Sequence, residues 1–235
     1  MITEAIVLAG GFGTRLKTVL QDVPKPMAPI NGRPFLEYQI NYLKQQGIKR
    51  VILSVGYLSE QIQNHFGNQF NGVEIDYAIE KTPLGTGGGI MHAFKKVKTL
   101  EALVVNGDTL FEIDIKDFYQ KHQANKALFS LALRKLDDIS RYGSVVIDNQ
   151  QIIQEFAEKG SHKGAGLING GVYIIHGYFF EEIYLPSKFS MEKDVFEYYY
   201  EKFNFYGFPF SNYFLDIGIP EDYQKAQDDF TKLGY

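Results

Sequence analysis

The chain has 235 residues, 45% of them hydrophobic, with a formal net charge of −4 and no cysteine. This length and hydrophobic content suit a single domain over residues 1–235, and the missing cysteines exclude disulfides and thiolate metal sites. The acidic balance argues against a nucleic acid partner, and no signal peptide or membrane-length apolar run is found, so we expect a cytoplasmic protein with no membrane partner.

Apolar, β-branched runs alternate with helical patterns through the first half of the chain. Such alternation is typical of βαβ units, which build a mostly parallel sheet through right-handed crossovers. The sequence therefore predicts an α/β fold. We expect strands at 5–9, 50–55, 73–79 and 102–106, and helices at 34–46, 58–66 and 86–97.

The second half has less helical pattern between its apolar runs. Expected strands at 128–133, 144–147 and 171–175 follow one another closely, so the sheet should become mixed there. A proline and acidic residues open a closing helix over 220–233. No linker or repeat interrupts the chain, which supports one domain.

The first expected strand leads into a glycine-rich loop that holds Arg15. Glycines after a strand leave backbone N–H groups open to phosphate oxygens, and Lys25, held between two prolines, adds positive charge. The loop lacks the Gly-Lys-Ser/Thr of a Walker loop, and Leu16 stands where a dinucleotide fingerprint needs its third glycine. A tight turn with an exposed arginine is the alternative.

Two aspartates follow apolar runs in distant parts of the chain. Asp108 comes after 102–107 and Asp216 after 213–215. Ligands of open α/β sheets lie beyond the carboxyl ends of the strands, so both carboxylates could meet at one Mg²⁺. A turn or a helix cap is the ordinary role of such an aspartate.

Six motifs in sequence resemble those of the sugar-1-phosphate nucleotidylyltransferases. They are Leu8–Leu16 with Val23–Met27, Pro83–Gly88, Asn106–Asp108, Phe156–Lys159, Asn169–Tyr173 and Leu215–Tyr223. The resemblance covers nearly the whole chain and implies a Rossmann-like three-layer sandwich. Residues 26–32 and 189–194 are most similar to the guanylyltransferases that act on D-glycero-D-manno-heptose 1-phosphate. Where the family often has threonine, this chain has Ile219.

The resemblance implies the residues of the site. Arg15 and Lys25 would be catalytic, and Asp108 and Asp216 would hold Mg²⁺. Nucleotide-binding residues would be Leu8, Ala9, Gly10, Gly11, Gly13, Thr14, Glu80, Pro83, Gly85, Thr86 and Gly87. Residues for the sugar phosphate would be Asn106, Gly143, Glu158, Lys159, Asn169 and Gly170.

The expected substrates are a nucleoside triphosphate and a sugar 1-phosphate, joined with release of pyrophosphate into a nucleotide sugar for surface polysaccharide. Glu80 offers only acceptors, which favours guanine and hence GTP. Glu80 as a turn cap, and UTP or CTP as the triphosphate, stay open. Related alternatives are UTP with N-acetylmuramate 1-phosphate and GTP with mannose 1-phosphate, and a non-enzyme alternative is a silent nucleotide-sugar-binding subunit.

Two further expectations concern architecture. Some sugar-1-phosphate nucleotidylyltransferases carry a left-handed β-helix after this domain, and we expect none here because the chain is too short to include one. An aromatic run between Phe196 and Phe214 either packs into the core or forms a sugar-pocket wall or a homodimer interface.

Overall fold

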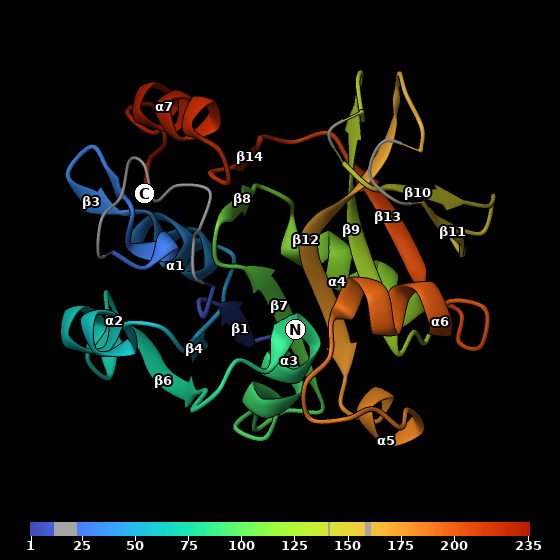
Figure 1. The fold of residues 1–235 in the computed structure, drawn as a ribbon, viewed down its shortest axis with the longest axis horizontal. Coiled ribbons are helices and arrows are strands. Elements are labelled where there is room, and N and C mark those ends of the chain that lie inside the picture. The colour runs from blue at the N-terminus through green and yellow to red at the C-terminus, as the bar shows by residue number, and fades with distance from the viewer. Residues whose placement is uncertain (12–22, 141, 158–160) are drawn as a thin grey trace.

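The structure is a computed structural model that describes residues 1–11, 23–140, 142–157 and 161–235 (Figure 1). Within these ranges no helix combines the length and the apolar character needed to span a membrane.

Parallel strands form the centre of the sheet, as predicted. Strand β1 (Glu4–Leu8) lies between β4 (Arg50–Val55) and β7 (Glu101–Asn106), and β6 (Val73–Ile79) pairs with β4. The short β5 (Gln69–Phe70) pairs antiparallel with β6 at the edge. Valine, isoleucine and leucine fill β1 and β4, because both faces of a parallel sheet are covered.

The second half of the sheet is mixed, which confirms the prediction. The long β12 (Gly166–His176) runs antiparallel to β7 and to β9 (Phe129–Leu136), and β13 (Tyr206–Phe210) joins β9 in parallel. Strand β10 (Ser144–Ile147) pairs antiparallel with the first part of β12, where Ser144 lies opposite Ile168. Strand β11 (Ile153–Ala157) pairs antiparallel with β10.

Helices cover both faces of the sheet, giving the three layers expected. Along β1, Ala5 and Val7 contribute to one apolar core and Ile6 to the other. The first core includes side chains of α1 (Phe35–Gln45), α2 (Ser59–Phe66), α4 (Ile115–Ala124) and α7 (Pro220–Asp229). The second includes side chains of α3 (Gly85–Phe94), α5 (Phe179–Glu182) and the π-helix Met191–Phe196, which α6 (Glu197–Tyr199) continues.

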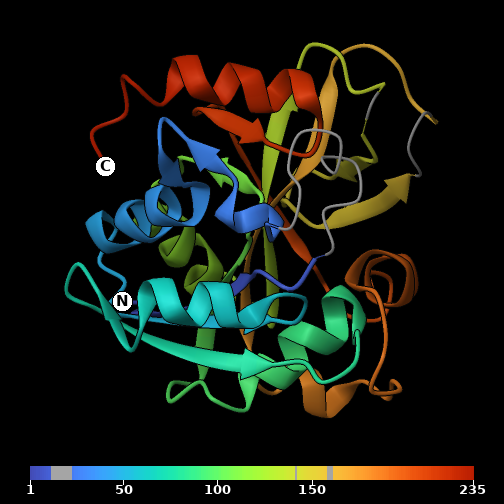
Figure 2. The same cartoon turned by 60° about the vertical axis from the view of Figure 1, so that its left-hand side comes forward.

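Two small pairings lie beside the main sheet. Strands β8 (Thr109–Phe111) and β14 (Phe214–Asp216) pair antiparallel. Strands β2 (Pro29–Ile30) and β3 (Arg33–Pro34) form a hairpin after a 3₁₀ turn at Lys25–Met27. Helix α7, red in Figure 2, lies along this hairpin, drawn in blue.

The aromatic run near the C-terminus lies largely in the core. Phe196, Phe205, Phe208 and Phe210 are buried, whereas the side chain of Tyr198 is exposed. This arrangement agrees with the core interpretation, and Phe196 also lines a cavity described below. A homodimer stays a prediction.

Candidate active site

A cavity of about 280 Å³ lies at the carboxyl ends of the parallel strands. Most of the described residues predicted to bind the nucleotide line this cavity. Asn106, which the sequence predicted to bind the sugar phosphate, and Gly107 line it too. The lining residues are Leu8, Gly10, Gly11, Glu80, Pro83, Gly85, Thr86, Asn106, Gly107 and Asp108. Gly13, Thr14 and Arg15 lie outside the described residues.

Two of the predicted nucleotide-binding residues lie elsewhere. Ala9 is fully buried, and its N–H donates to the carbonyl of Ser54. Gly87 packs against Phe189, which precedes the π-helix: a Cβ on Gly87 would lie 2.2 Å from the ring of Phe189. Neither residue lines the cavity, but each is the direct neighbour in the chain of a residue that does.

The structure brings Lys25 together with Asp108 and Asp216. The ammonium Nζ of Lys25 lies 2.5 Å from Oδ2 of Asp108 and 3.7 Å from Oδ1 of Asp216. Asp108 follows β7, and the pairing of β14 with β8 places Asp216 opposite Thr109, the next residue. The N–H of Ile217 also donates to the carbonyl of Asp108. A three-residue ladder thus joins segments more than 100 positions apart.

The electrostatics of Asp216 reflect this crowding. Burial raises the pKa of its carboxyl, and the neighbouring Asp108 raises it further, against the lowering effects of Lys25 and of the Gly218 N–H. A carboxylate whose pKa is raised is held at a cost to folding, which a bound cation relieves. Two crowded carboxylates that share one ammonium are therefore suited to a divalent ion.

Glu80 lies in the cavity wall with both carboxylate oxygens in use. Oε1 accepts from the hydroxyl of Ser54 at 3.1 Å, and Oε2 accepts from the N–H of Leu84 at 3.0 Å. The turn-capping alternative is therefore present in the structure. Each oxygen has a second lone pair, so guanine recognition by Glu80 stays a prediction.

A second cavity, of about 380 Å³, holds two of the residues predicted to bind the sugar. Gly143 and Asn169 line it. Gly170 does not: it is buried, and a Cβ there would lie 2.5 Å from the ring of Phe111. Glu158 and Lys159 lie outside the described residues.

The same cavity has lining residues that the sequence did not assign. They are Tyr142, Ser144, Val145, Phe156, Ala157, Glu192, Lys193, Phe196 and Glu197. Glu192 and Lys193 belong to residues 189–194, whose sequence resembles the guanylyltransferases but predicts no role for either side chain. The available sequence signal is Ser190, a residue type typical of a helix N-cap. In the structure its side chain accepts from the Lys193 N–H at the start of the π-helix.

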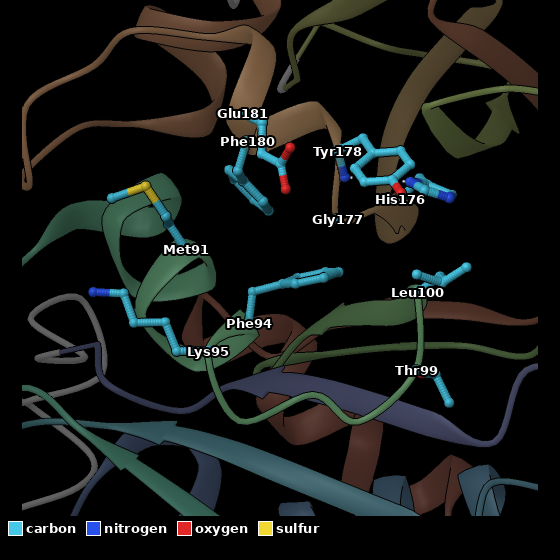
Figure 3. Close-up of a pocket in the computed structure, with 10 residues that line it drawn as sticks. All are labelled: Met91, Phe94, Lys95, Thr99, Leu100, His176, Gly177, Tyr178, Phe180 and Glu181. Atoms are coloured by element: carbon cyan, nitrogen blue, oxygen red, sulfur yellow. Dashed lines mark hydrogen bonds between the residues drawn. The ribbon is translucent and has the colours of Figure 1, made fainter.

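A third cavity, of about 350 Å³, lies at the other end of β7 (Figure 3). The rings of Phe94, Phe180 and Tyr178 border it, with Leu100 and His176 at one side. It is far along the sheet from Asp108, and no predicted site residue lines it.

Comparison with known proteins places these observations in a family context. The family model described as nucleotidyl transferase matches residues 4–232. A D-glycero-alpha-D-manno-heptose 1-phosphate guanylyltransferase of Aneurinibacillus thermoaerophilus is 48% identical over 95% of this chain and 96% of its own length. The enzyme of the same name from Campylobacter jejuni is 49% identical over 94% and 96%.

A solved structure has the same fold. The crystal structure of HddC from Yersinia pseudotuberculosis complexed with GMP-PN superposes with a TM-score of 0.86 at 41% identity, covering 97% of this chain and all of that one.

Proposed function

This chain belongs to the nucleotidyl transferase family, and we propose that it is a guanylyltransferase that joins GTP to D-glycero-D-manno-heptose 1-phosphate. The products are the GDP-sugar and pyrophosphate. The names of the two relatives that match over almost their whole length support this substrate pair, as does the GMP-PN complex of the structural neighbour.

One observation carries the catalytic part of the proposal. Lys25 lies against Asp108 and Asp216, and Asp108 lines the same cavity as Gly10 and Gly11. Convergence of a cation, two carboxylates and open backbone is what a reacting triphosphate requires. A silent binding subunit would not need to keep all three charged groups, which disfavours that alternative.

The residues present fit Mg²⁺. Asp108 and Asp216 offer hard oxygen ligands that already share one cation, the Lys25 ammonium. No group of three or more metal-ligating side chains occurs among the described residues, so substrate phosphates and water would complete the coordination. When bound, the ion neutralises charge on the triphosphate and on the attacking phosphate.

The reaction is a displacement at phosphorus. A phosphate oxygen of the sugar 1-phosphate forms a bond to the α-phosphorus of GTP while the bond from that phosphorus to the bridging oxygen of pyrophosphate breaks. The attacking phosphate is already deprotonated at neutral pH, so no general base is needed. Lys25 stabilises charge at the α-phosphate, and Arg15 would bind the β- and γ-phosphates.

The proposal extends to the setting of the reaction. A GTP-consuming enzyme works where GTP is available, so we place it in the cytoplasm. Its product would supply heptose to a surface polysaccharide such as a lipopolysaccharide, a capsule or an S-layer glycan. We also propose that residues 1–235 form a single domain and that this domain carries the transferase activity.

A pyrophosphate-release assay tests the proposal. GTP, UTP, CTP and dTTP are each combined with the 1-phosphates of D-glycero-D-manno-heptose, mannose, glucose and N-acetylmuramate. We expect the highest kcat/KM for GTP with the heptose substrate. Turnover with UTP and N-acetylmuramate 1-phosphate but none with GTP would contradict it, and preference for mannose 1-phosphate would correct the sugar alone.

A further inference from the structure

The cavity that holds Gly143 and Asn169 has one lysine among its described lining residues, Lys193. This residue lies in the first turn of the π-helix Met191–Phe196, and its backbone N–H donates to the side chain of Ser190 at 3.3 Å. The reaction proposed above needs a dianionic sugar phosphate in this region. A positively charged side chain in the cavity wall is therefore a candidate to bind that phosphate.

The side chain of Lys193 has no partner in the described part of the chain. Neither a hydrogen bond nor an ion pair joins its ammonium to a described residue, although Glu197 follows it by four positions and lines the same cavity. In an α-helix a lysine commonly pairs with a carboxylate at this spacing, whereas residues 191–196 form a π-helix. An ammonium left available beside a cavity can bind an anion without first breaking an ion pair.

Contacts between the two cavities fix the backbone that carries Lys193. The hydroxyl of Thr86, in the wall of the nucleotide cavity, accepts from the Met191 N–H at 2.9 Å and donates to Glu192 at 3.1 Å. The carbonyl of Phe189 accepts from the N–H groups of Gly87 and Gly88. The start of the π-helix is thus held against the segment that lines the nucleotide cavity.

Close packing makes this junction rigid. Gly85 has a φ of +76°, and a Cβ there would lie 2.5 Å from the carbonyl oxygen of Phe189. A Cβ on Gly88 would lie 2.4 Å from the carbonyl oxygen of Ser187. Glycine at these positions lets the two segments touch, so Lys193 is held in a fixed relation to the nucleotide cavity.

The carboxylates of the cavity have a different role available. Glu192 accepts from the hydroxyls of both Thr86 and Ser190, so its charge is already used to hold the junction. Glu197 offers acceptors, which suit sugar hydroxyls and repel a phosphate. Of the charged groups described in this wall, only Lys193 attracts the phosphate.

We propose that Lys193 binds the phosphate of the sugar 1-phosphate and orients it for attack on the α-phosphorus. This inference rests on the proposed function and adds a substrate-binding residue to it. Because an ammonium contacts a phosphate through charge and up to three donors, glutamine at this position would lose the charge and arginine would keep it.

The test compares steady-state constants of Lys193→Gln and Lys193→Arg with those of the unaltered enzyme. We expect Lys193→Gln to raise KM for the sugar 1-phosphate by about 10- to 100-fold, as for loss of one charge-assisted contact, and to change KM for GTP less than about twofold. Lys193→Arg should restore most of the affinity. Lys188→Gln, an exposed lysine outside the cavity lining, is the matched control and should leave both constants unchanged.

Two results would overturn the inference: an unchanged KM for the sugar 1-phosphate in Lys193→Gln, or an equal rise in both KM values. The unaltered enzyme tests the proposed function separately in the same assay. If it releases no pyrophosphate, titration calorimetry with the sugar 1-phosphate decides: binding that Lys193→Gln retains overturns the inference, and binding that it loses supports it. Absence of binding to the unaltered protein overturns both.

Discussion

At the scale of single residues, Lys25 explains how two carboxylates can lie close together before any metal arrives. Its ammonium contacts Asp108 and Asp216, whose mutual repulsion and burial would otherwise disfavour the ionised pair. The same ammonium lies beside the cavity proposed for the triphosphate. One lysine thus holds the two carboxylates together and, in the proposed reaction, would supply positive charge to the triphosphate.

Replacing Asp216 by asparagine should separate function from stability. We expect kcat/KM to fall by about 100-fold or more, because one of the two carboxylate ligands proposed for the divalent cation is lost. The melting temperature at pH 7 should be unchanged or higher, since the raised pKa shows that ionised Asp216 costs folding free energy. Pyrophosphate release and thermal melts measure the two effects.

Asp228→Asn is the matched control, because Asp228 is exposed on α7. It should alter neither quantity. Wild-type activity in Asp216→Asn would exclude Asp216 as a metal ligand.

Because His122 is buried with a lowered pKa, we expect the protein to lose stability in mild acid. Its side chain is fully buried, Nδ1 lies 2.8 Å from the Ser130 hydroxyl, and burial outweighs the nearby Glu101 to lower its pKa to about 4. The unfolded chain takes up a proton near pH 6.5, so the stabilising effect is complete above that pH and is lost as the pH falls toward 4.

Urea unfolding at several pH values checks this prediction. Between pH 6 and 4.5 the free energy of unfolding should fall by up to about 1.4 kcal/mol per pH unit more in the unaltered protein than in His122→Gln. Equal slopes in the two proteins would show that His122 is not the titrating group.

At the scale of elements, the short β14 brings one of the two candidate metal ligands to the site. It pairs with β8 over three residues and thereby brings Asp216 to Asp108. An element of three residues has no periodicity to detect, so its pairing could not be predicted. The position of Asp108 just after a strand could be predicted, because the central residues of β7, 102–105, form a continuous buried apolar run.

The remaining differences have similar physical causes. Helix α4 went unpredicted although Asp114 caps it by accepting from the Asp117 N–H. The predicted closing helix extended to 233, but α7 ends at Asp229. Gly170 was assigned to the sugar from its motif, whereas its lack of a side chain makes room for Phe111. Local sequence does not report which distant ring fills a space.

The start of α7 gives a stability prediction. Ile219 occupies the N-cap position with extended backbone (φ −133°, ψ 156°) and provides no side-chain cap. Ile219→Thr would add a hydroxyl that accepts from an N–H of the first turn, so we expect about 1 kcal/mol of added stability. Ile219→Val keeps the branching without the hydroxyl and should not stabilise; urea unfolding distinguishes them. Equal stability of the two variants would contradict the capping argument.

At the scale of the whole molecule, the sheet separates two charged regions. The site lies at the carboxyl ends of the parallel strands. At the amino ends, Arg50 pairs with Glu4, Glu74 and Asp76, and its side chain is 7% exposed. Glu4 also accepts from the backbone N–H groups of Lys98 and Thr99. This second cluster ties β1, β4 and β6 to the loop before β7.

Removing the arginine should therefore destabilise the whole fold. Arg50→Met leaves Glu4 charged and buried, which costs about 3–5 kcal/mol. Arg33→Met, which breaks the more exposed pair with Glu37, should cost less than about 1 kcal/mol. Denaturant unfolding at pH 7 compares them, and similar losses would show that the Arg50 cluster has no special role.

In the proposed site Asp108 and Asp216, held together by Lys25, bind one divalent cation beside the triphosphate. A crystal grown with Mn²⁺ and a non-reactive GTP analogue tests it directly through the anomalous signal of manganese. We expect one strong peak within coordination distance of both carboxylates and of a phosphate oxygen, with Lys25 turned to the α-phosphate. Manganese bound elsewhere, or GTP phosphates bound away from Lys25, would contradict it.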